Sequence, residues 1–475
     1  MRPILLVPLL AVLPACAVNP ATGQRQLMLV SEGQEIAMGR EADPQISGQY
    51  GLYPDSGLQV YVRGLGQRLA AVSERPNLPW SFRVVDDPII NAFAVPGGFI
   101  YVTRGILAHF NSEAELVSVL GHEIGHVTAR HSASQMSTQQ LAQVGLVAGA
   151  ILAPQYQDFA GLAQAGLGLM FLKFSRDDER QADDLGLRYL TRIRYDAREM
   201  PKVFAMLASV SQGEGAGRLP GWLSTHPDPA DRQQRISQLI AAMPDTAGRT
   251  VNRNEYLRRL AGLVFDHNPR DGFFRGPAFY HPDLRFQMVF PEGWRTANQR
   301  QAVVAQPSSQ DGLLQLTLDE AASADVAVRT FLGQDGVTAG PVRASSAGGL
   351  TGATARFVAR TEDGTLAGLV AAVALDGRVY RLLGVAPEAK WPTYDAAAAA
   401  AFGSFARLTD RAALAAQPLR LEIVTADRAM TLAEFHQRYP SQVSLDVVAR
   451  LNQLQPAGRV TAGYLVKRVV GGPLP

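Results

Sequence analysis

Cysteine is almost absent from this sequence. Cys16 is the only cysteine in 475 residues, so no internal disulfide can form and packing of the core must stabilise the chain. A strong charge of one sign is also missing, because 45 basic and 43 acidic residues nearly balance and no long basic block occurs. We therefore expect no nucleic acid partner.

Long uninterrupted hydrophobic runs are missing as well. Residues 141–172 are apolar and rich in glycine and alanine, but a proline and polar residues interrupt them at 154–158. The remaining pieces are too short to cross a bilayer, so we expect no membrane span here. With 47% hydrophobic and 19% charged residues, the composition is that of a globular protein, and the length predicts two to four domains.

The amino-terminal residues have the features of an export signal. Residues 4–12 form a hydrophobic run that is too short for a membrane span. Residues 13–16, Leu-Pro-Ala-Cys, resemble a bacterial lipobox, which implies cleavage before Cys16 and attachment of lipid to its thiol. An acidic residue after the cysteine would signal retention in the inner membrane, but residues 17–18 are alanine and valine. The expected location is therefore the periplasm, with an anchor in the outer membrane. An ordinary signal peptide with an incidental cysteine is the alternative.

A helix is predicted over residues 113–134. Ser112 followed by Glu115 is typical of a capping box, in which the serine accepts from one amide and the glutamate reaches back to another. Apolar residues then recur at helical spacing, which predicts that one face of this helix is buried.

The sequence HEIGH lies on this predicted helix. His122 and His126 are four residues apart, so both imidazoles can reach one tetrahedral zinc ion. Glu123 can take the proton of a zinc-activated water, which is how this motif hydrolyses peptides. His131 comes five residues after His126, so we expect it to point away from the metal and to be structural.

A third metal ligand is expected from a second helix, which begins after Ser175. Glu179 and Asp183 are four residues apart and share a face of this helix. Glu179 can bind zinc, while Asp183 can accept a hydrogen bond from the outer nitrogen of a ligand histidine and fix its tautomer. The alternative is a solvated acidic helix.

HEIGH followed by Glu-x-x-x-Asp resembles the HtpX-type and BepA-type gluzincin peptidases over residues 31–245. The resemblance implies an α+β, mainly helical zincin-type domain with a small edge sheet and one zinc ion per chain. It also implies that residues 141–172 form two helices beside the active site. The implied activity is endopeptidase quality control, with unfolded or misassembled envelope proteins as substrates.

Residues 91–102 resemble the strand and turn that precede the metal helix in this family. The resemblance implies that Gly98 and Phe99 begin a sheet edge, Phe99 to Thr103, which pairs with the backbone of the substrate.

Residues 224–229 resemble the family's downstream His-Pro segment, which implies that His226 lies near the metal. His226 then either donates a hydrogen bond to the oxyanion of the intermediate or plugs the open zinc position. Arg232 is a candidate for binding substrate or intermediate, with a surface arginine as the alternative.

The chain after residue 265 is expected to be an accessory domain of antiparallel strands with one or two helices. Asp363-Gly364 and Asp376-Gly377 predict hairpins, and Tyr394 to Leu408 predicts a helix. This part resembles a PsbP-like or Mog-type α/β sandwich. Three side chains are core candidates, namely Trp391, Phe402 and Phe405.

The last sixty residues have the order strand, helix, helix, strand and resemble a LysM module, most clearly at residues 448–454. The opening Gly-Asp-Thr of such modules is replaced by residues 428–431, Arg-Ala-Met-Thr, so peptidoglycan attachment remains one of two alternatives.

The sequence thus predicts five segments. The segments are a lipoprotein signal peptide (1–15), a linker (16–30), a zinc metallopeptidase domain (31–265), an α+β accessory domain (270–410) and a LysM-like module (417–475).

The alternative to a peptidase is a zinc-stabilised periplasmic chaperone or assembly factor with latent or no peptidase activity. A cell-wall adaptor is a weaker alternative, because it does not explain the metal motif.

Overall fold

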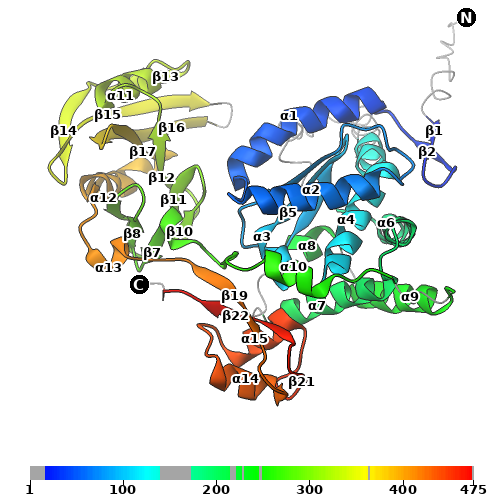
Figure 1. The fold of residues 1–475 in the computed structure, drawn as a ribbon. Coiled ribbons are helices and arrows are strands. Elements are labelled where there is room, and N and C mark those ends of the chain that lie inside the picture. Colours follow the sequence, from blue (N-terminus) through cyan, green and yellow to red (C-terminus); the bar gives the residue numbers. More distant parts are fainter. Residues whose placement is uncertain are drawn as a thin grey trace, which may run out of the picture. The chain divides into compact units, whose positions relative to one another are not determined.

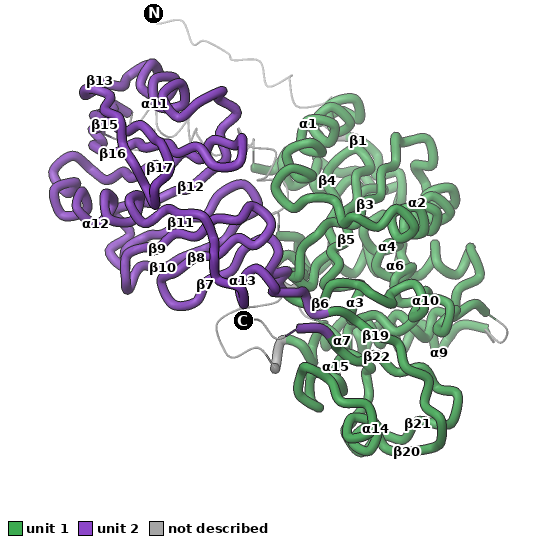
Figure 2. Tube along the Cα trace, turned by 60° about the vertical axis from the view of Figure 1, so that its left-hand side comes forward, with its two compact units in different colours: residues 1–266, 420–470 green, residues 267–419, 471–475 purple. Residues whose placement is uncertain are grey.

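The computed structural model describes residues 16–139, 173–213, 221–226, 229–244, 249–361 and 364–472. The predicted signal peptide and the whole apolar stretch 141–172, with its two expected helices, lie outside these ranges. By its contacts the chain divides into two compact units (Figure 2). Unit 1 comprises residues 1–266 and 420–470, and unit 2 comprises residues 267–419 and 471–475.

The predicted mixed α+β class is confirmed, with a mainly helical amino-terminal part and strands dominating after residue 266 (Figure 1). Residues 131–139 of unit 1 are also helical. The helices of unit 1 are α1 (Glu32–Tyr50), α2 (Ser56–Ala70), α3 (Arg104–His109), α4 (Glu113–Thr128), α6 (Arg176–Arg192), α7 (Met200–Gly213), α8 (Gly221–Thr225), α9 (Pro229–Ala241), α10 (Arg253–Arg259), α14 (Leu432–Arg438) and α15 (Leu445–Asn452), with a 3-10 turn, η3 (Ala197–Glu199).

Helix α4 carries HEIGH and is buried along its whole length. It packs closely on α6 because glycines remove side chains from the contact. A Cβ on Gly186 would lie 2.9 Å from the backbone nitrogen of His122, and a Cβ on Gly125 would lie 2.9 Å from the carbonyl oxygen of Ala182. The two faces that carry the predicted metal ligands therefore meet directly.

The predicted helix starts are confirmed, one of them with a difference. Ser175 and Asp178 form a complete capping box on α6. On α4, Ser112 accepts from the amide of Glu115, but the Glu115 carboxylate accepts from the amide of Asn111 at 2.9 Å. Glu115 is buried rather than turned back over the helix end, because a segment from the far end of the sequence covers it.

A small sheet lies beside α4 and has the order β3-β5-β4. Strand β5 (Phe99–Thr103) pairs with β3 (Ser81–Val85) in parallel and with β4 (Ala92–Val95) in antiparallel fashion. The prediction that Phe99 to Thr103 forms a free edge is therefore wrong, because β5 is the central strand and all five of its residues are buried. Among the described strands, β4 is the outer one that packs on α4.

The carboxyl-terminal segment has the predicted order of strand, helix, helix, strand. Strand β19 (Leu419–Thr425) pairs antiparallel with β22 (Leu465–Val470), and β6 (Val264–Phe265) extends this sheet. A short pair, β20 (Met430–Thr431) with β21 (Arg459–Val460), closes the segment. Residues 420–470 belong to the same compact unit as the HEIGH helix.

Lys467 joins this segment to the start of α4. Its fully buried ammonium donates to the carbonyl oxygens of Ala108 and Phe110, both at 2.8 Å. Next to it, Gln453 donates to the Glu115 carboxylate at 2.8 Å. These bonds satisfy the carbonyls at the end of α3 and fix the turn from which α4 begins.

The other end of α4 contacts the amino-terminal hairpin, in which β1 (Cys16–Val18) pairs with β2 (Arg25–Leu27). Asn19 and Gln26 both donate to the carbonyl oxygen of Ala129, at 3.1 and 3.2 Å. The hairpin that contains Cys16 is thus attached to the carboxyl-terminal end of the HEIGH helix.

Unit 2 is built on an eight-stranded sheet of order β10-β11-β12-β17-β16-β15-β13, with β14 also paired to β15. Residues of β16 alternate between two hydrophobic clusters. Leu369 and Ala371 face the cluster that contains α12, and Val370 and Ala372 face the cluster that contains α11. The elements of this sheet are β10 (Arg295–Asn298), β11 (Ala302–Gln306), β12 (Leu313–Asp319), β13 (Val337–Ala339), β14 (Arg343–Ala347), β15 (Leu350–Thr361), β16 (Gly364–Leu375), β17 (Arg378–Pro387), α11 (Ala324–Leu332) and α12 (Trp391–Gly403).

A smaller sheet of order β18-β9-β8-β7 completes unit 2. Both predicted hairpins are confirmed, and Asp376 and Gly377 have the positive φ angles that a tight two-residue turn requires. All three predicted core side chains of this unit, Trp391, Phe402 and Phe405, are buried. The remaining elements are β7 (Phe273–Arg275), β8 (Ala278–His281), β9 (Phe286–Val289), β18 (Ala406–Arg407), α13 (Arg411–Leu414) and a 3-10 turn, η4 (Pro269–Asp271).

Candidate metal centre

Four buried side chains bring metal-binding atoms to one point in unit 1. One donor atom each from His122, His126, Glu179 and His226 lies within 4.8 Å of the other three. His122 Nε2 is 3.0 Å from His126 Nε2 and 3.3 Å from His226 Nδ1. His226 Nδ1 is 2.8 Å from Glu179 Oε1. Imidazole nitrogens and a carboxylate in this number form a typical donor set for zinc.

Three helices supply these donors. His122 and His126 stand one turn apart on α4, and Glu179 faces them from α6 because the glycine contact brings the two helices together. His226 directly follows α8, and its amide donates to the carbonyl oxygen of Trp222 at 2.9 Å. The structure therefore brings together all three predicted metal ligands and the predicted His226.

The electrostatics favour the protonation states that metal binding requires for three of the four donors, whereas Glu179 and Glu123 outweigh burial and raise the pKa of His226. Burial lowers the pKa of His122 and of His126, so both imidazoles are neutral. Burial opposes ionisation of Glu179, but His226 and Arg232 outweigh it and hold the pKa of this carboxyl well below its usual range. Neutral imidazoles beside an ionised carboxylate can bind a divalent cation without first losing protons.

A second layer of polar groups holds the donors. Asp183 Oδ1 lies 3.0 Å from His122 Nδ1, as predicted for a residue that fixes the tautomer of this ring. Arg232 forms a two-point ion pair with Asp183, at 2.6 and 2.8 Å, and contacts Glu179 Oε2 at 2.6 Å. Its guanidinium stacks on the rings of Phe204 and Trp222. Arg232 is only 2% exposed, which rules out the surface interpretation.

The prediction from sequence did not place three residues of this layer near the donors. His131 Nδ1 lies 2.9 Å from His126 Nδ1, although we expected it to point away. Trp222 stacks on His226 and Phe174 stacks on His126, with ring centroids 4.6 and 4.0 Å apart. The spacing of Trp222 and His226, four residues on one helical turn, was a usable signal. For Phe174 the sequence contains no such signal, because this residue lies outside any predicted helix.

Glu123 lies beside the donors with one oxygen turned toward them. Its Oε1 is 3.6 Å from His226 Nε2 and has no hydrogen-bond partner within the described residues. Burial raises the pKa of this carboxyl to about 7, although the charge of His226 opposes the shift. A buried carboxylate oxygen in this state fits a site that is completed by an ion and its water.

The remaining predicted site residues lie elsewhere. Gly98 has a positive φ of 99° in the turn before β5, and Phe99 is buried in a cluster with α1 residues. Their predicted contact with substrate stays a prediction that this packing does not favour. Cys16 begins β1 of the amino-terminal hairpin.

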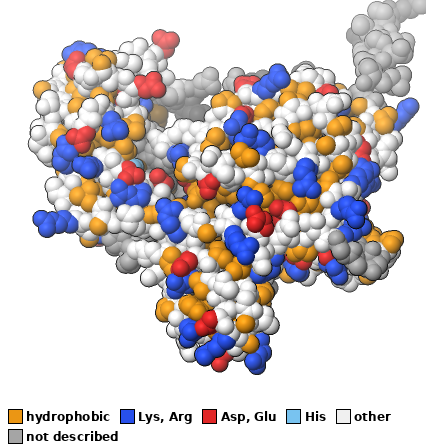
Figure 3. All heavy atoms as spheres, in the orientation of Figure 1, with side chains coloured by type: hydrophobic (Ala, Val, Ile, Leu, Met, Phe, Trp, Pro, Cys, Tyr) orange, Lys and Arg blue, Asp and Glu red, His pale blue; other side chains and the backbone are white. Residues whose placement is uncertain are grey.

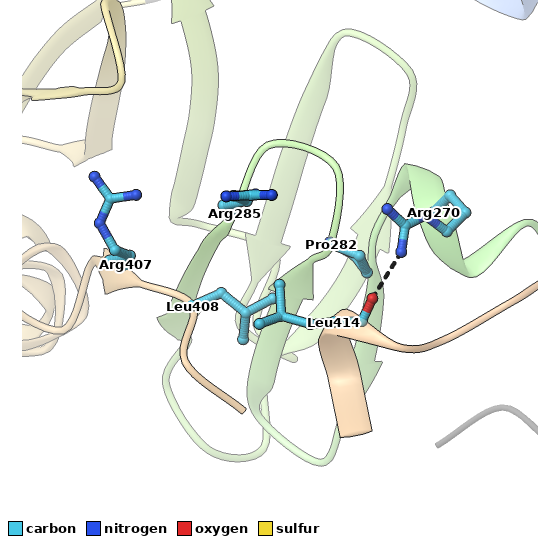
Figure 4. Close-up of a pocket in the computed structure, with 6 residues that line it drawn as sticks. All are labelled: Arg270, Pro282, Arg285, Arg407, Leu408 and Leu414. Carbon is cyan, nitrogen blue, oxygen red and sulfur yellow. Dashed lines mark hydrogen bonds between the residues drawn. The ribbon is translucent and has the colours of Figure 1, made fainter. Parts of the chain in front are cut away.

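A pocket of about 280 Å³ lies in unit 2, and none of the metal-donor residues lines it (Figure 4). Two of its three arginines are already engaged. Arg270 donates to the carbonyl oxygen of Leu414 at 2.9 Å, and Arg407 pairs with Asp376 at 2.5 Å. No acid, base or nucleophile lines the pocket, so it is not a catalytic site. The lining residues are Arg270, Pro282, Arg285, Arg407, Leu408 and Leu414.

The surface has mixed charge on the face shown in Figure 3, where basic and acidic side chains are interspersed over both units. Within the described ranges, no helix combines the length and apolarity needed to cross a bilayer.

Residues 58–240 match peptidase family M48. The beta-barrel assembly-enhancing protease of Escherichia coli K12 is 33% identical over 233 residues, 46% of this chain and 47% of that protein. The putative beta-barrel assembly-enhancing protease of Vibrio cholerae is 34% identical over 233 residues, 46% of this chain and 48% of that protein. A mitochondrial metalloendopeptidase OMA1, from Schizosaccharomyces pombe, is 31% identical over 228 residues, 46% of this chain and 65% of that protein. This chain spans about half the length of the bacterial relatives it matches.

Two solved structures have weak similarity to part of the chain. Cyanobacterial PsbP from Synechocystis is 16% identical and covers 27% of this chain and 91% of its own, with a TM-score of 0.24. The Ran-binding protein Mog1p of Saccharomyces cerevisiae is 11% identical and covers 29% of this chain and 97% of its own, with a TM-score of 0.22. The predicted PsbP-like or Mog-type sandwich stays a prediction.

Proposed function

Because residues 58–240 match peptidase family M48, we propose that this protein is a zinc-dependent endopeptidase. One observation carries the proposal: donor atoms of His122, His126, Glu179 and His226 meet at one buried point. A buried oxygen of Glu123 lies 3.6 Å from His226 Nε2. The predicted zinc cofactor agrees with the family and with this donor set.

The catalytic role of Glu123 follows from its position and protonation. Zinc, when bound, supplies a Lewis acid that polarises the scissile carbonyl and acidifies the attacking water. Glu123 Oε1 takes the proton from that water and later passes it to the nitrogen of the leaving amine. A carboxyl whose pKa is raised to about 7 is well suited to both transfers near neutral pH.

His122, His126 and Glu179 would hold the metal, and Asp183 and Arg232 would hold these ligands in place. Asp183 receives the outer proton of His122, and Arg232 neutralises the two carboxylates together. Arg232 is therefore proposed as a positioning residue rather than a substrate-binding one, because its donors are occupied inside the protein.

His226 is proposed to be the plug of the site. Its Nδ1 reaches the same point as the other donors and bonds Glu179 at 2.8 Å, which is the arrangement of a fourth ligand. Turning away from this point would free the position that a substrate carbonyl needs. The alternative role, donation to the oxyanion, requires the same histidine to face the substrate instead.

The substrate backbone is proposed to pair with β4 rather than with β5. Among the described strands, β4 is an outer strand of the small sheet, and it packs on the HEIGH helix. Main-chain pairing of this kind binds an extended segment with little preference for its side chains, which suits unfolded polypeptides.

We further propose that the protein works in the periplasm, held to the outer membrane by lipid on Cys16, on unfolded or misassembled envelope proteins. The lipobox-like residues 13–16 carry the anchoring proposal. Two relatives are named for the assembly of beta-barrels, which agrees with envelope substrates. Residues 417–475 are proposed as a LysM-like module, whose attachment to peptidoglycan is tested by sedimentation of the protein with purified sacculi.

The decisive experiment compares wild type, Glu123→Gln and His226→Ala for zinc content and casein cleavage. We expect all three to bind zinc and Glu123→Gln to lose about 10²- to 10⁴-fold in rate, because its amide cannot accept a proton. Faster cleavage by His226→Ala marks His226 as the plug, and slower cleavage marks it as the oxyanion donor. Absence of zinc from the wild type would refute the proposal.

The second candidate function is a zinc-stabilised chaperone or assembly factor without peptidase activity. It is favoured if the wild type and His226→Ala bind zinc but neither cleaves casein. Retention of Glu123, which metal binding alone does not require, favours the enzyme.

A further inference from the structure

We propose that His131 is a positioning residue that fixes the tautomer of His126, and that the amino-terminal hairpin secures this arrangement through Gln181. The inference rests on the proposed metal site, which it deepens. It starts from the row of polar contacts formed by Asn19, Gln181, His131 and His126.

The direction of each hydrogen bond follows from the chemistry of the groups. Gln181 Oε1 can only accept, and it lies 2.8 Å from His131 Nε2, which must therefore carry the proton. Asp178 Oδ1, 3.6 Å from the same nitrogen, is also only an acceptor. In a neutral imidazole the other nitrogen is then bare, so His131 Nδ1 accepts a hydrogen bond.

The acceptor on His131 decides the state of His126. His126 Nδ1 lies 2.9 Å from His131 Nδ1 and must donate, so its proton sits on Nδ1. The lone pair of His126 is then on Nε2, which is the atom that faces His122 Nε2 at 3.0 Å. His131 thus does for His126 what Asp183 does for His122, with a neutral ring in place of a carboxylate.

The hairpin fixes the orientation of the Gln181 amide. Asn19 Nδ2 lies 3.3 Å from Gln181 Oε1 and also donates to the carbonyl oxygen of Ala129 at 3.1 Å. A flipped Gln181 would present its NH₂ group both to Asn19 and to His131 and would leave two donors facing each other. Asn19 is buried and lies three residues after Cys16, so the predicted anchor belongs to the same hairpin as the side chain that orients Gln181.

The test measures zinc binding rather than activity. The variants are His131→Phe, which removes the acceptor and keeps a ring, and His131→Asn, whose side-chain oxygen can replace Nδ1. His109→Phe is the matched control, because His109 is a half-buried histidine of α3 whose Nδ1 bonds the carbonyl oxygen of Gly105 and lies outside the cluster. Zinc affinity is read by competition with a chromophoric chelator, and ligand geometry by the absorption spectrum of the cobalt-substituted protein.

We expect His131→Phe to bind zinc about 10- to 100-fold more weakly and to alter the cobalt spectrum. His131→Asn should restore most of the affinity, and His109→Phe should match wild type. A His131→Phe protein with wild-type affinity and spectrum would overturn the proposal. If His131→Phe does not fold, Gln181→Leu on the partly exposed face of α6 tests the same relay and has the same two outcomes.

The contribution of the hairpin is tested separately by Asn19→Ala. We expect a smaller loss of zinc affinity in the same direction, because Gln181 keeps its contact with His131 but loses the group that orients it. Unchanged affinity in Asn19→Ala would remove the hairpin from the proposal and leave His131 in it. Failure of the wild type to bind zinc would refute the proposed function itself, which is a different result from equal binding by wild type and His131→Phe.

Discussion

The two units differ in what they bury. Among the described residues, every buried polar or charged side chain belongs to unit 1, and unit 2 has none. Unit 2 encloses two purely hydrophobic clusters on the faces of its sheet, and its ion pairs are partly exposed. Unit 1 encloses histidines, carboxylates, Arg232 and Lys467.

This difference separates chemistry from scaffolding. Buried charges destabilise a fold unless each one is paired, so a protein retains them where they perform a task. In unit 1 several of the buried groups belong to the donor cluster, and Lys467 holds the start of the helix that carries two of its histidines. In unit 2 the hydrophobic packing on the two faces of the sheet supplies most of the stability.

The largest expected effect is in unit 1, for Lys467→Met. The change leaves the carbonyl oxygens of Ala108 and Phe110 without partners and Glu115 without its nearest cation, at a cost of about 3–5 kcal/mol in the free energy of unfolding. Urea unfolding measures this loss. The matched control is Lys390→Met in unit 2, whose ammonium is exposed; equal stability of the two variants would contradict the comparison.

A core truncation in unit 2 should be local. Leu382 is fully buried, and Leu382→Ala should cost about 2–5 kcal/mol through the lost contacts and the cavity. We expect calorimetry to show that only the unit 2 transition moves, while zinc content stays at the wild-type level. Loss of zinc from this variant would mean that unit 2 supports the metal centre.

Acid should weaken unit 2 through His281. Burial lowers the pKa of this imidazole to about 4, below the value near 6.5 of an unfolded histidine. The folded state therefore disfavours the charged form, so this contribution is complete above pH 6.5 and is lost as the pH falls toward about 4. The loss is about 3 kcal/mol once the pH has reached about 4.

His281→Asn tests this expectation, because its side chain can still accept from the amide of Leu284 but cannot titrate. The urea midpoint of unit 2 should depend less on pH in this variant than in wild type between about pH 7 and about pH 5. An identical pH dependence in both proteins would show that His281 does not control it.

The smallest effect is expected for Arg407→Ala, which removes an ion pair with Asp376 on the surface of unit 2. Both side chains are largely exposed, so water and salt replace the interaction and the midpoint of thermal unfolding should not change. A clear loss of stability would show that unit 2 also depends on its polar groups.

For both units, the sequence predicted which helices and strands form better than it predicted which of them pair or pack together. The order of elements in residues 419–470 and the hairpin at Asp376 follow from local periodicity and turn chemistry, which act within a few residues. The helix expected at Tyr394 to Leu408 instead runs over Trp391–Gly403, because Phe405 leaves the helix to fill the core. The order of strands around β5 depends on contacts between distant segments, so no local pattern revealed it.

The site shows the same limit. His122, His126 and Glu179 were predicted because metal ligands recur at helical spacing. His131 was misread because five residues along a straight helix point away from the ligand face. The structure has a residue with positive φ at Arg130, which ends the helical path and turns His131 back toward His126.

The bond between Lys467 and Phe110 also sets an order of events during synthesis. The two residues are 357 positions apart, so the turn before α4 receives its last partners only after residue 467 has been made and delivered. Unit 2 is nearly continuous in sequence and can complete its sheet before then. During synthesis, unit 2 can therefore fold before the turn that precedes α4 in unit 1 is fixed. The proposed peptidase centre is completed last.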